Sequence, residues 1–338
     1  MRDNKEILSI DLVEPGMITA EIVFNNTGNV LVWEDMTLDS NMILHLKNMG
    51  IGTIAVYKEQ KPPFTIEYEQ DVGKTKQIFQ ALITEENLDV KSAEEIVENV
   101  TAKSENRRNI IDSVTQVRKI DEYTYYHSLN VSMLGMLIGK WMRLDEYKIR
   151  QIALAGLLHD IGKAKIPPEI LNKAGRLTED EFAEMRRHSE YGYNIVAAMD
   201  EIPDEVAMAV LTHHEREDGS GYPIGLRGNQ LGLYSKIIAV ADIFDAMTAN
   251  RTYKGKDTPF KAFELMQHGS FGVLDTKVLN AFLENITGYY IGARVKLNTG
   301  ETGEVVFMNK LDFSRPVVLV NGRYVDTALS NEKIVEFI

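Results

Sequence analysis

The chain has 338 residues, of which 44% are hydrophobic and 26% are charged. This composition is typical of a globular protein and excludes a largely disordered chain. The absence of cysteine excludes disulfide frameworks, zinc ribbons, iron–sulfur clusters and cysteine nucleophiles, so any bound metal would depend on His, Asp and Glu. The formal net charge of −13 disfavours polymeric nucleic acid and anionic membranes as partners.

Neither a secretory signal nor a membrane span is visible in the sequence. The N-terminus leads into no apolar core, and no stretch approaches the roughly 18 apolar residues that a spanning helix requires. The most apolar stretches, residues 131–142 and 237–247, are short enough to be buried helices. We therefore expect a cytoplasmic protein without membrane insertion, and its length predicts more than one domain.

Residues 1–60 have the mixed pattern of a small α/β domain. Two alternating segments predict a hairpin, and a segment of helical periodicity followed by Gly50 predicts a helix with a glycine C-cap. A β-branched strand follows. The expected elements are residues 17–24, 30–33, 38–49 and 51–57.

Residues 61–120 are expected to form a linker and a helical spacer. Pro62 and Pro63 mark the linker, and narrow apolar stripes follow on charged helices from residue 71 onward. Such stripes are compatible with two interpretations. A solvated spacer is the preferred one, and a homodimer formed through the helical region 71–120 is the alternative.

Residues 121–286 have the pattern of an all-α domain, with a capping-box sequence from Thr178 to Glu181. From residue 287 onward, short β segments alternate with turns, among them Asn321-Gly322. The sequence therefore predicts a multidomain chain in which a helical domain is flanked by a small α/β domain and a small β-strand domain. The expected C-terminal strands are residues 289–297, 303–308, 316–320 and 323–325.

Histidines and acids gather in the predicted helical domain. Five of the seven histidines lie between residues 127 and 214. The predicted helix 237–247 is apolar except at Asp242 and Asp245, which are three residues apart and therefore on one face. Carboxylates in a helix that is apolar on all sides are costly to bury unless a cation meets them.

Taken singly, each of these positions is better explained as a hydrogen-bonded core residue, but together they indicate a metal site. Imidazole with carboxylate suits Fe, Mn, Zn or Ni. Seven candidate ligands are too many for one ion, whereas a bridging Asp160 would give two ions four protein ligands each. The first set is His127, His159, Asp160 and Asp242, and the second is Asp160, His188, His213 and His214.

Two motifs resemble a known family. His159-Asp160, followed by the segment 213–223 with His213-His214-Glu215 and Gly221-Tyr222-Pro223, resembles the HD-GYP branch of the HD superfamily of metal-dependent phosphohydrolases. The resemblance covers about residues 121–285. It implies an all-α domain that hydrolyses cyclic di-GMP, a bacterial second messenger, to pGpG and in some members on to GMP. It also implies two or three metal ions, commonly iron or manganese.

The resemblance carries the seven ligands over and implies further roles. Asp160 and Lys163 would be catalytic, with a hydroxide bridging the two ions as nucleophile and Lys163 stabilising the phosphoryl group. Asp245 would lie beside the site, where it would orient a ligand, act as a proton acceptor or pair with Arg251. The positions matched to substrate binding are Lys163, Tyr222, Asp245, Arg251 and Lys254.

Tyr123 departs from the family pattern. Some members carry a carboxylate four residues before the first histidine and hold a third ion, so Tyr123 predicts two divalent ions, Fe or Mn. The expected function is a cyclic di-GMP phosphodiesterase. The alternatives are a hydrolase of another cyclic dinucleotide and a nucleotide-binding signalling module with little turnover.

Overall fold

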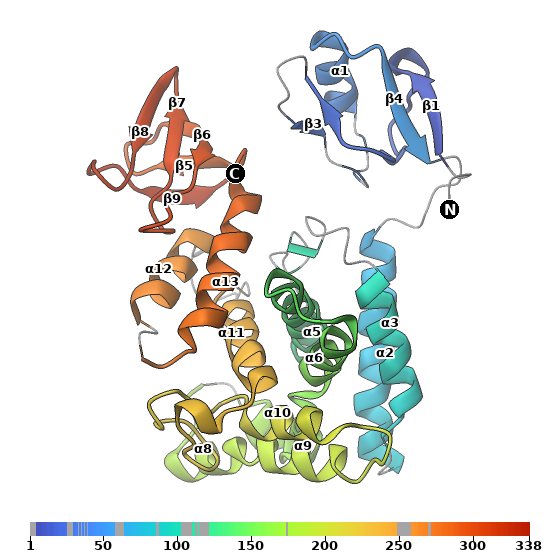
Figure 1. Cartoon of the computed structure of the whole chain (residues 1–338), viewed down its shortest axis with the longest axis vertical. Helices are drawn as coiled ribbons and strands as arrows, with labels where there is room; N and C mark the ends of the chain where they lie inside the picture. The colour runs from blue at the N-terminus through green and yellow to red at the C-terminus, as the bar shows by residue number, and fades with distance from the viewer. Residues whose placement is uncertain are drawn as a thin grey trace. The chain divides into compact units, whose positions relative to one another are not determined.

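The chain is seen here as a computed structural model (Figure 1). It describes residues 5–25, 30–32, 34, 36, 38, 40–57, 64–85, 88–102, 110, 111, 114, 122–173, 175–248, 258–269 and 272–338. The chain divides into two compact units, Met1–Gln70 and Asp71–Ile338. The division into four segments that the sequence predicts is finer than these two units and stays a prediction.

The N-terminal unit combines short antiparallel strand pairs with one helix, as expected from its mixed pattern. Strand β1 (Lys5–Ser9) pairs with β4 (Thr53–Tyr57), and β2 (Val23–Phe24) pairs with β3 (Val30–Val32). Helix α1 (Ser40–Asn48) ends before Gly50, whose φ of +76° confirms the predicted glycine cap. The 3₁₀ turn η1 is Ile10–Leu12.

Two details of this unit differ from the prediction. The expected strand 17–24 shortens to two residues, because Met17 and Thr19 instead bond to the backbone of Leu38 and Met36. Strand β1 was not predicted, since its partner β4 lies far along the sequence and its own side chains alternate only weakly in burial.

The second unit is mainly helical up to residue 290. Helices α5 and α6 run along each other, and α11 packs on both (Figure 1). The elements are α2 (Phe64–Glu85), α3 (Val90–Ala102), α5 (Tyr123–Trp141), α6 (Glu146–Leu158), η3 (Ile161–Lys165), α7 (Pro168–Leu171), α8 (Glu179–Arg186), α9 (His188–Val196), α10 (Asp204–Thr212), η4 (Gly228–Gln230), α11 (Leu233–Thr248), α12 (Pro259–Gly269), α13 (Thr276–Ile286) and η5 (Thr287–Tyr290).

The predicted apolar helices are confirmed as buried helices α5 and α11. Glycine permits the close contact of α5 with α6, because a Cβ on Gly156 would lie 2.8 Å from the backbone nitrogen of Ser132. The capping box at Thr178 and Glu181 is also confirmed. Among the described residues, no helix is long and apolar enough to cross a membrane.

The region expected to be a spacer differs from that expectation in one respect. Helix α3 buries Ala93, Ile96, Val97 and Val100 and packs against α5 and α6. Its apolar stripe therefore covers the helical core and is not a solvated face. Homodimerisation through residues 71–120 stays a prediction.

The C-terminal segment forms one antiparallel sheet in the strand order β8-β7-β6-β5-β9. Asn321 and Gly322 both have positive φ, of 49° and 85°, so the predicted two-residue turn between β7 and β8 is confirmed. The last strand was not predicted. The strands are β5 (Arg294–Leu297), β6 (Thr302–Phe307), β7 (Val317–Val320), β8 (Arg323–Asp326) and β9 (Ile334–Phe337).

Candidate metal centre

The seven predicted ligands come from five helices and meet in the interior of the helical unit. His127 lies in α5 and Asp242 in α11, while the remaining ligands lie at the ends of α6, α9 and α10. His213 and His159 are each about 1% exposed, and the most exposed ligand side chain is His214 at 28%. Because most of these ligands lie at helix ends, the packing of the helices brings their polar side chains together inside the unit.

The ligand atoms form overlapping groups, two of which lie within the two sets expected from the sequence and one of which joins members of both. Three groups have donor atoms within 4.8 Å of one another. They are His127 with His159 and Asp242, then His188 with His213 and His214, and between them His159 with Asp160 and His213.

Asp160 lies between these groups. Its Oδ2 atom lies 3.4 Å from His159 Nε2 and 3.6 Å from His127 Nε2. The other oxygen, Oδ1, lies 3.4 Å from His188 Nε2. The two oxygens of one carboxylate therefore face different groups, which is what a ligand shared by two ions requires.

Three histidines are oriented by the helix end on which they lie. The Nδ1 atoms of His159, His188 and His213 each donate to the backbone carbonyl oxygen three residues earlier, at 2.7 Å in every case. In the neutral ring this leaves a lone pair on Nε2. The Nε2 atoms of His188 and His213 lie 3.3 Å apart. Two lone pairs directed at one point repel each other unless a cation lies between them, so this donor set fits a divalent metal ion.

His127 is oriented by a carboxylate in place of a carbonyl. Its Nδ1 lies 2.7 Å from Asp245 Oδ2, and its Nε2 lies 3.1 Å from Asp242 Oδ1. Asp245 is fully buried and also accepts a hydrogen bond from Asn130 Nδ2 at 2.8 Å. This placement favours the ligand-orienting role for Asp245 over direct contact with substrate. Asn130 was missed, although it lies one turn after His127.

Burial and neighbouring charges set the pKa values of the ligands. Burial lowers the pKa of His188 and His213 below the usual imidazole range, and it lowers the pKa of His214 to about 3. Burial also acts to lower the pKa of His127, but hydrogen bonds to Asp242 and Asp245 raise it to about 9. The group of His127, His159 and Asp242 and the group of His188, His213 and His214 are the two halves of the centre. The pKa is raised at His127 in the first half and lowered at the histidines of the second.

The carboxylate of Asp160 stays ionised despite its burial. Burial acts to raise its pKa, but the Lys163 ammonium and His159 hold the pKa well below the usual range. Lys163 lies in η3, one turn after Asp160, and Nζ donates to Oδ2. Gly162 lets η3 approach α9, because a Cβ there would lie 2.0 Å from the carbonyl oxygen of His188.

Tyr222 covers the second group of histidines. Its ring centroid lies 4.7 Å from that of His214 and 6.5 Å from that of His188. The loop that carries Tyr222 is held by Glu215, a buried residue that the sequence left unassigned. The Glu215 carboxylate accepts hydrogen bonds from the backbone N–H groups of residues 224–226 at 2.7–3.1 Å.

The remaining predicted positions have different outcomes. Tyr123 stacks on His127, with ring centroids 5.6 Å apart and an interplanar angle of 11°. It therefore contributes a ring at the position where a third ion would need a carboxylate. Arg251 and Lys254 lie outside the described residues.

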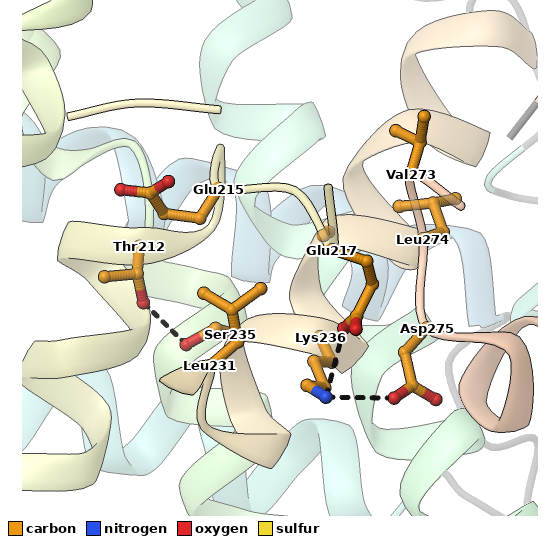
Figure 2. Close-up of a pocket in the computed structure, with 10 residues that line it drawn as sticks. Thr212, Glu215, Glu217, Leu231, Ser235, Lys236, Val273, Leu274 and Asp275 are labelled. Carbon is orange, nitrogen blue, oxygen red and sulfur yellow. Dashed lines mark hydrogen bonds and ion pairs between the residues drawn. The ribbon is translucent and has the colours of Figure 1, made fainter. Parts of the chain in front are cut away.

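A small pocket is lined by Thr212, Glu215 and residues that support the elements of the site (Figure 2). The Thr212 hydroxyl bonds to Ser235 at 2.7 Å, and Lys236 reaches Asp275 and Glu217 at 3.0 Å each. These contacts tie α10 to α11 and to the start of α13. The candidate metal ligands do not line this pocket. The contacts among its lining residues hold together the elements that carry His213 and Asp242.

Comparison with known proteins places the chain in a family. The HD domain model matches residues 94–278, more than half of the chain. The chain belongs to the HD domain family. The HD-GYP motifs lie within the matched region, and relatives named cyclic di-GMP phosphodiesterases confirm the predicted resemblance.

The HD domain protein has relatives with two kinds of substrate in their names. It is 36% identical over 233 residues to a cyclic di-GMP phosphodiesterase from Pseudomonas aeruginosa, covering 69% of this chain and 56% of that protein. It is 37% identical over 186 residues to 3'3'-cGAMP-specific phosphodiesterase 1 from Vibrio cholerae, covering 54% and 41%. The chain thus spans about half the length of these curated relatives.

A solved structure supports the fold alone. The Bdellovibrio bacteriovorus protein Bd1817, described as an HDG"Y"P protein, is 12% identical and aligns with a TM-score of 0.53. The alignment covers 82% of this chain and 98% of the other. The arrangement of elements is therefore shared even where few residues are.

Proposed function

We propose that this HD domain protein is a metal-dependent phosphodiesterase that hydrolyses cyclic di-GMP to pGpG. The observation that carries the proposal is Asp160, whose two oxygens face two separate groups of converging imidazole Nε2 atoms. That arrangement fits two divalent ions. Imidazole with carboxylate suits Fe, Mn, Zn or Ni, and we propose Fe or Mn because the resemblance to the HD-GYP branch implies them. Relatives named cyclic di-GMP phosphodiesterases support the choice of substrate.

The residues of the chain would divide the work as follows. When bound, the ions would lower the pKa of a water molecule and neutralise charge on the phosphoryl oxygens. Asp160 would hold both ions at one separation, and the histidines would leave positions open for water and substrate. Lys163 would donate to a non-bridging phosphoryl oxygen and stabilise the charge that develops there. Tyr222 would border the substrate on the side of His214.

The test combines metal analysis with product identification. The full chain is purified without oxygen, its iron and manganese are quantified, and cyclic di-GMP is added before chromatography. We expect about two ions per chain and pGpG as the first product, with later GMP as a second step. Unchanged cyclic di-GMP in a sample with both ions loaded would contradict the proposal.

A second candidate is hydrolysis of 3′3′-cGAMP, and the Vibrio cholerae relative at 37% identity favours testing it. Parallel assays with cyclic di-GMP, 3′3′-cGAMP and cyclic di-AMP separate these substrates by kcat/KM.

A third candidate, a signalling module that binds nucleotide with little turnover, predicts tight binding without product. All seven ligands are present, which supports turnover.

A further inference from the structure

Arg186 lies beside the metal centre, and the proposed mechanism assigns it no role. Its guanidinium carbon lies 5.4 Å from the ring centroid of Tyr222 and 4.4 Å from that of Phe182. Phe182 and Arg186 are four residues apart in α8 and therefore share a face of that helix. The cation thus joins α8 to the loop that covers the second histidine group.

The contacts of Arg186 leave its N–H groups available to a ligand. The residue is exposed, and Phe182 beside it is 44% exposed. In the part of the chain that the structure describes, no carboxylate pairs with Arg186. Its neighbour Arg187 contrasts with it, because Arg187 pairs with Glu184 at 2.9 Å. Contact with aromatic rings restricts the guanidinium, which lowers the cost of ordering it against a ligand.

The position of Arg186 relative to the site suggests which part of a substrate it meets. Tyr222 lies against His214, and the exposed Arg186 in turn contacts the Tyr222 ring at the rim of the site. A phosphate held at the ions would carry its base one sugar away, in the direction of this rim. Arginine presents a planar fork of N–H donors that matches two acceptors, and guanine offers O6 and N7 in that geometry. Adenine has a donor where guanine has O6, so the same fork rejects it.

We propose that Arg186 is a specificity-determining residue that donates to O6 and N7 of a guanine base of the substrate. This inference rests on the proposed function, because it assumes that a cyclic dinucleotide enters the site. It predicts a preference for guanine over adenine at one base position. A phosphate contact, by contrast, would strengthen the binding of every cyclic dinucleotide equally.

The experiment compares Arg186→Met and Arg186→Lys with the neighbouring control Arg187→Met in the metal-loaded full chain. Dissociation constants for non-hydrolysable phosphorothioate analogues of cyclic di-GMP and cyclic di-AMP are measured by calorimetry, and kcat/KM is measured for cyclic di-GMP. Bis(p-nitrophenyl) phosphate, a phosphodiester without a base, reports on the metal centre. We expect both Arg186 variants to bind cyclic di-GMP roughly 10- to 100-fold more weakly. Binding of cyclic di-AMP, hydrolysis of the nitrophenyl ester and the control should stay near wild type.

Several outcomes would overturn the assignment. Full binding by Arg186→Lys, or an equal loss for both cyclic dinucleotides, would show a charge contact with phosphate. Unchanged binding in both variants would show no contact. If wild type binds cyclic di-GMP without cleaving it, the proposed activity fails while the binding comparison still decides the role of Arg186. If wild type cleaves the nitrophenyl ester but binds no cyclic dinucleotide, the proposed function and this inference both fail.

Discussion

The two halves of the metal centre are held in different ways. In the half around His127, the imidazole bonds to the buried carboxylate of Asp245. In the half around His188 and His213, these two imidazoles bond to neutral backbone carbonyls at helix ends, as His159 does beside His127. A carboxylate partner makes an imidazole a stronger base and a stronger metal ligand than a carbonyl does. We therefore expect the half around His127 to bind its ion more tightly.

The accessibility of the two halves also differs. His127 and Asp245 are buried by α5 and α11, whereas His214 at the other half is 28% exposed and lies beside Tyr222. The more open half also has Arg186 at its rim. We therefore expect tight ion binding in the half around His127 and substrate access at the half around His214, with Asp160 between them.

The largest expected effect comes from removing the Asp160 carboxylate, which lies between the two halves. Asp160→Ala should abolish hydrolysis of cyclic di-GMP and lower the bound metal, because both ions lose a shared ligand. Metal analysis and product chromatography on the same sample measure both effects. Wild-type turnover in this variant would contradict the bridging role.

Changing the Asp245 carboxylate, which bonds to His127, should weaken metal binding in one half and leave the other half unchanged. Asp245→Asn keeps the shape and the contact with Asn130 but removes the charge, so we expect metal affinity to fall about 10- to 100-fold in that half only. Titration of the metal-free protein with Mn²⁺ should then show one weakened and one unchanged site. Ser132→Ala removes a hydroxyl that donates to the carbonyl oxygen of Ala153 in α6, and it serves as a control for changes within α5. Two equally weakened sites would argue against the division.

Lys163 should matter for turnover but not for metal binding. Lys163→Ala is expected to slow kcat about 100-fold, because one donor to the phosphoryl group is lost. Metal content should stay at the wild-type level, since no ligand is removed. A loss of metal that accompanies the loss of turnover would assign Lys163 to holding Asp160 in place.

The smallest effect is expected at the open half. Tyr222→Ala should weaken binding of cyclic di-GMP by about 1–3 kcal/mol, the usual value of an aromatic contact with a base. Metal content should change little. Tyr222→Phe is the matched control, because it keeps the ring and removes only the hydroxyl. Equal losses in both variants would assign the effect to the hydroxyl.

Local patterns were sufficient for much of this structure. The periodicity of residues 131–142 and 237–247 predicted the helices that carry His127 and Asp242. The Asn321-Gly322 turn was predictable because few residues other than glycine and asparagine tolerate positive φ. Strands β1 and β9 were missed because each is defined by pairing with a distant partner.

The sequence alone limited the candidate metal ligands to imidazoles and carboxylates, because the chain has no cysteine, and its motifs predicted the seven side chains that converge in the structure. The tertiary structure decided how those side chains are oriented. It placed Asp245 behind His127, attached Glu215 to the loop of Tyr222 and brought Arg186 to the rim. These roles depend on contacts between separate elements, and no local spacing in the chain encodes such contacts.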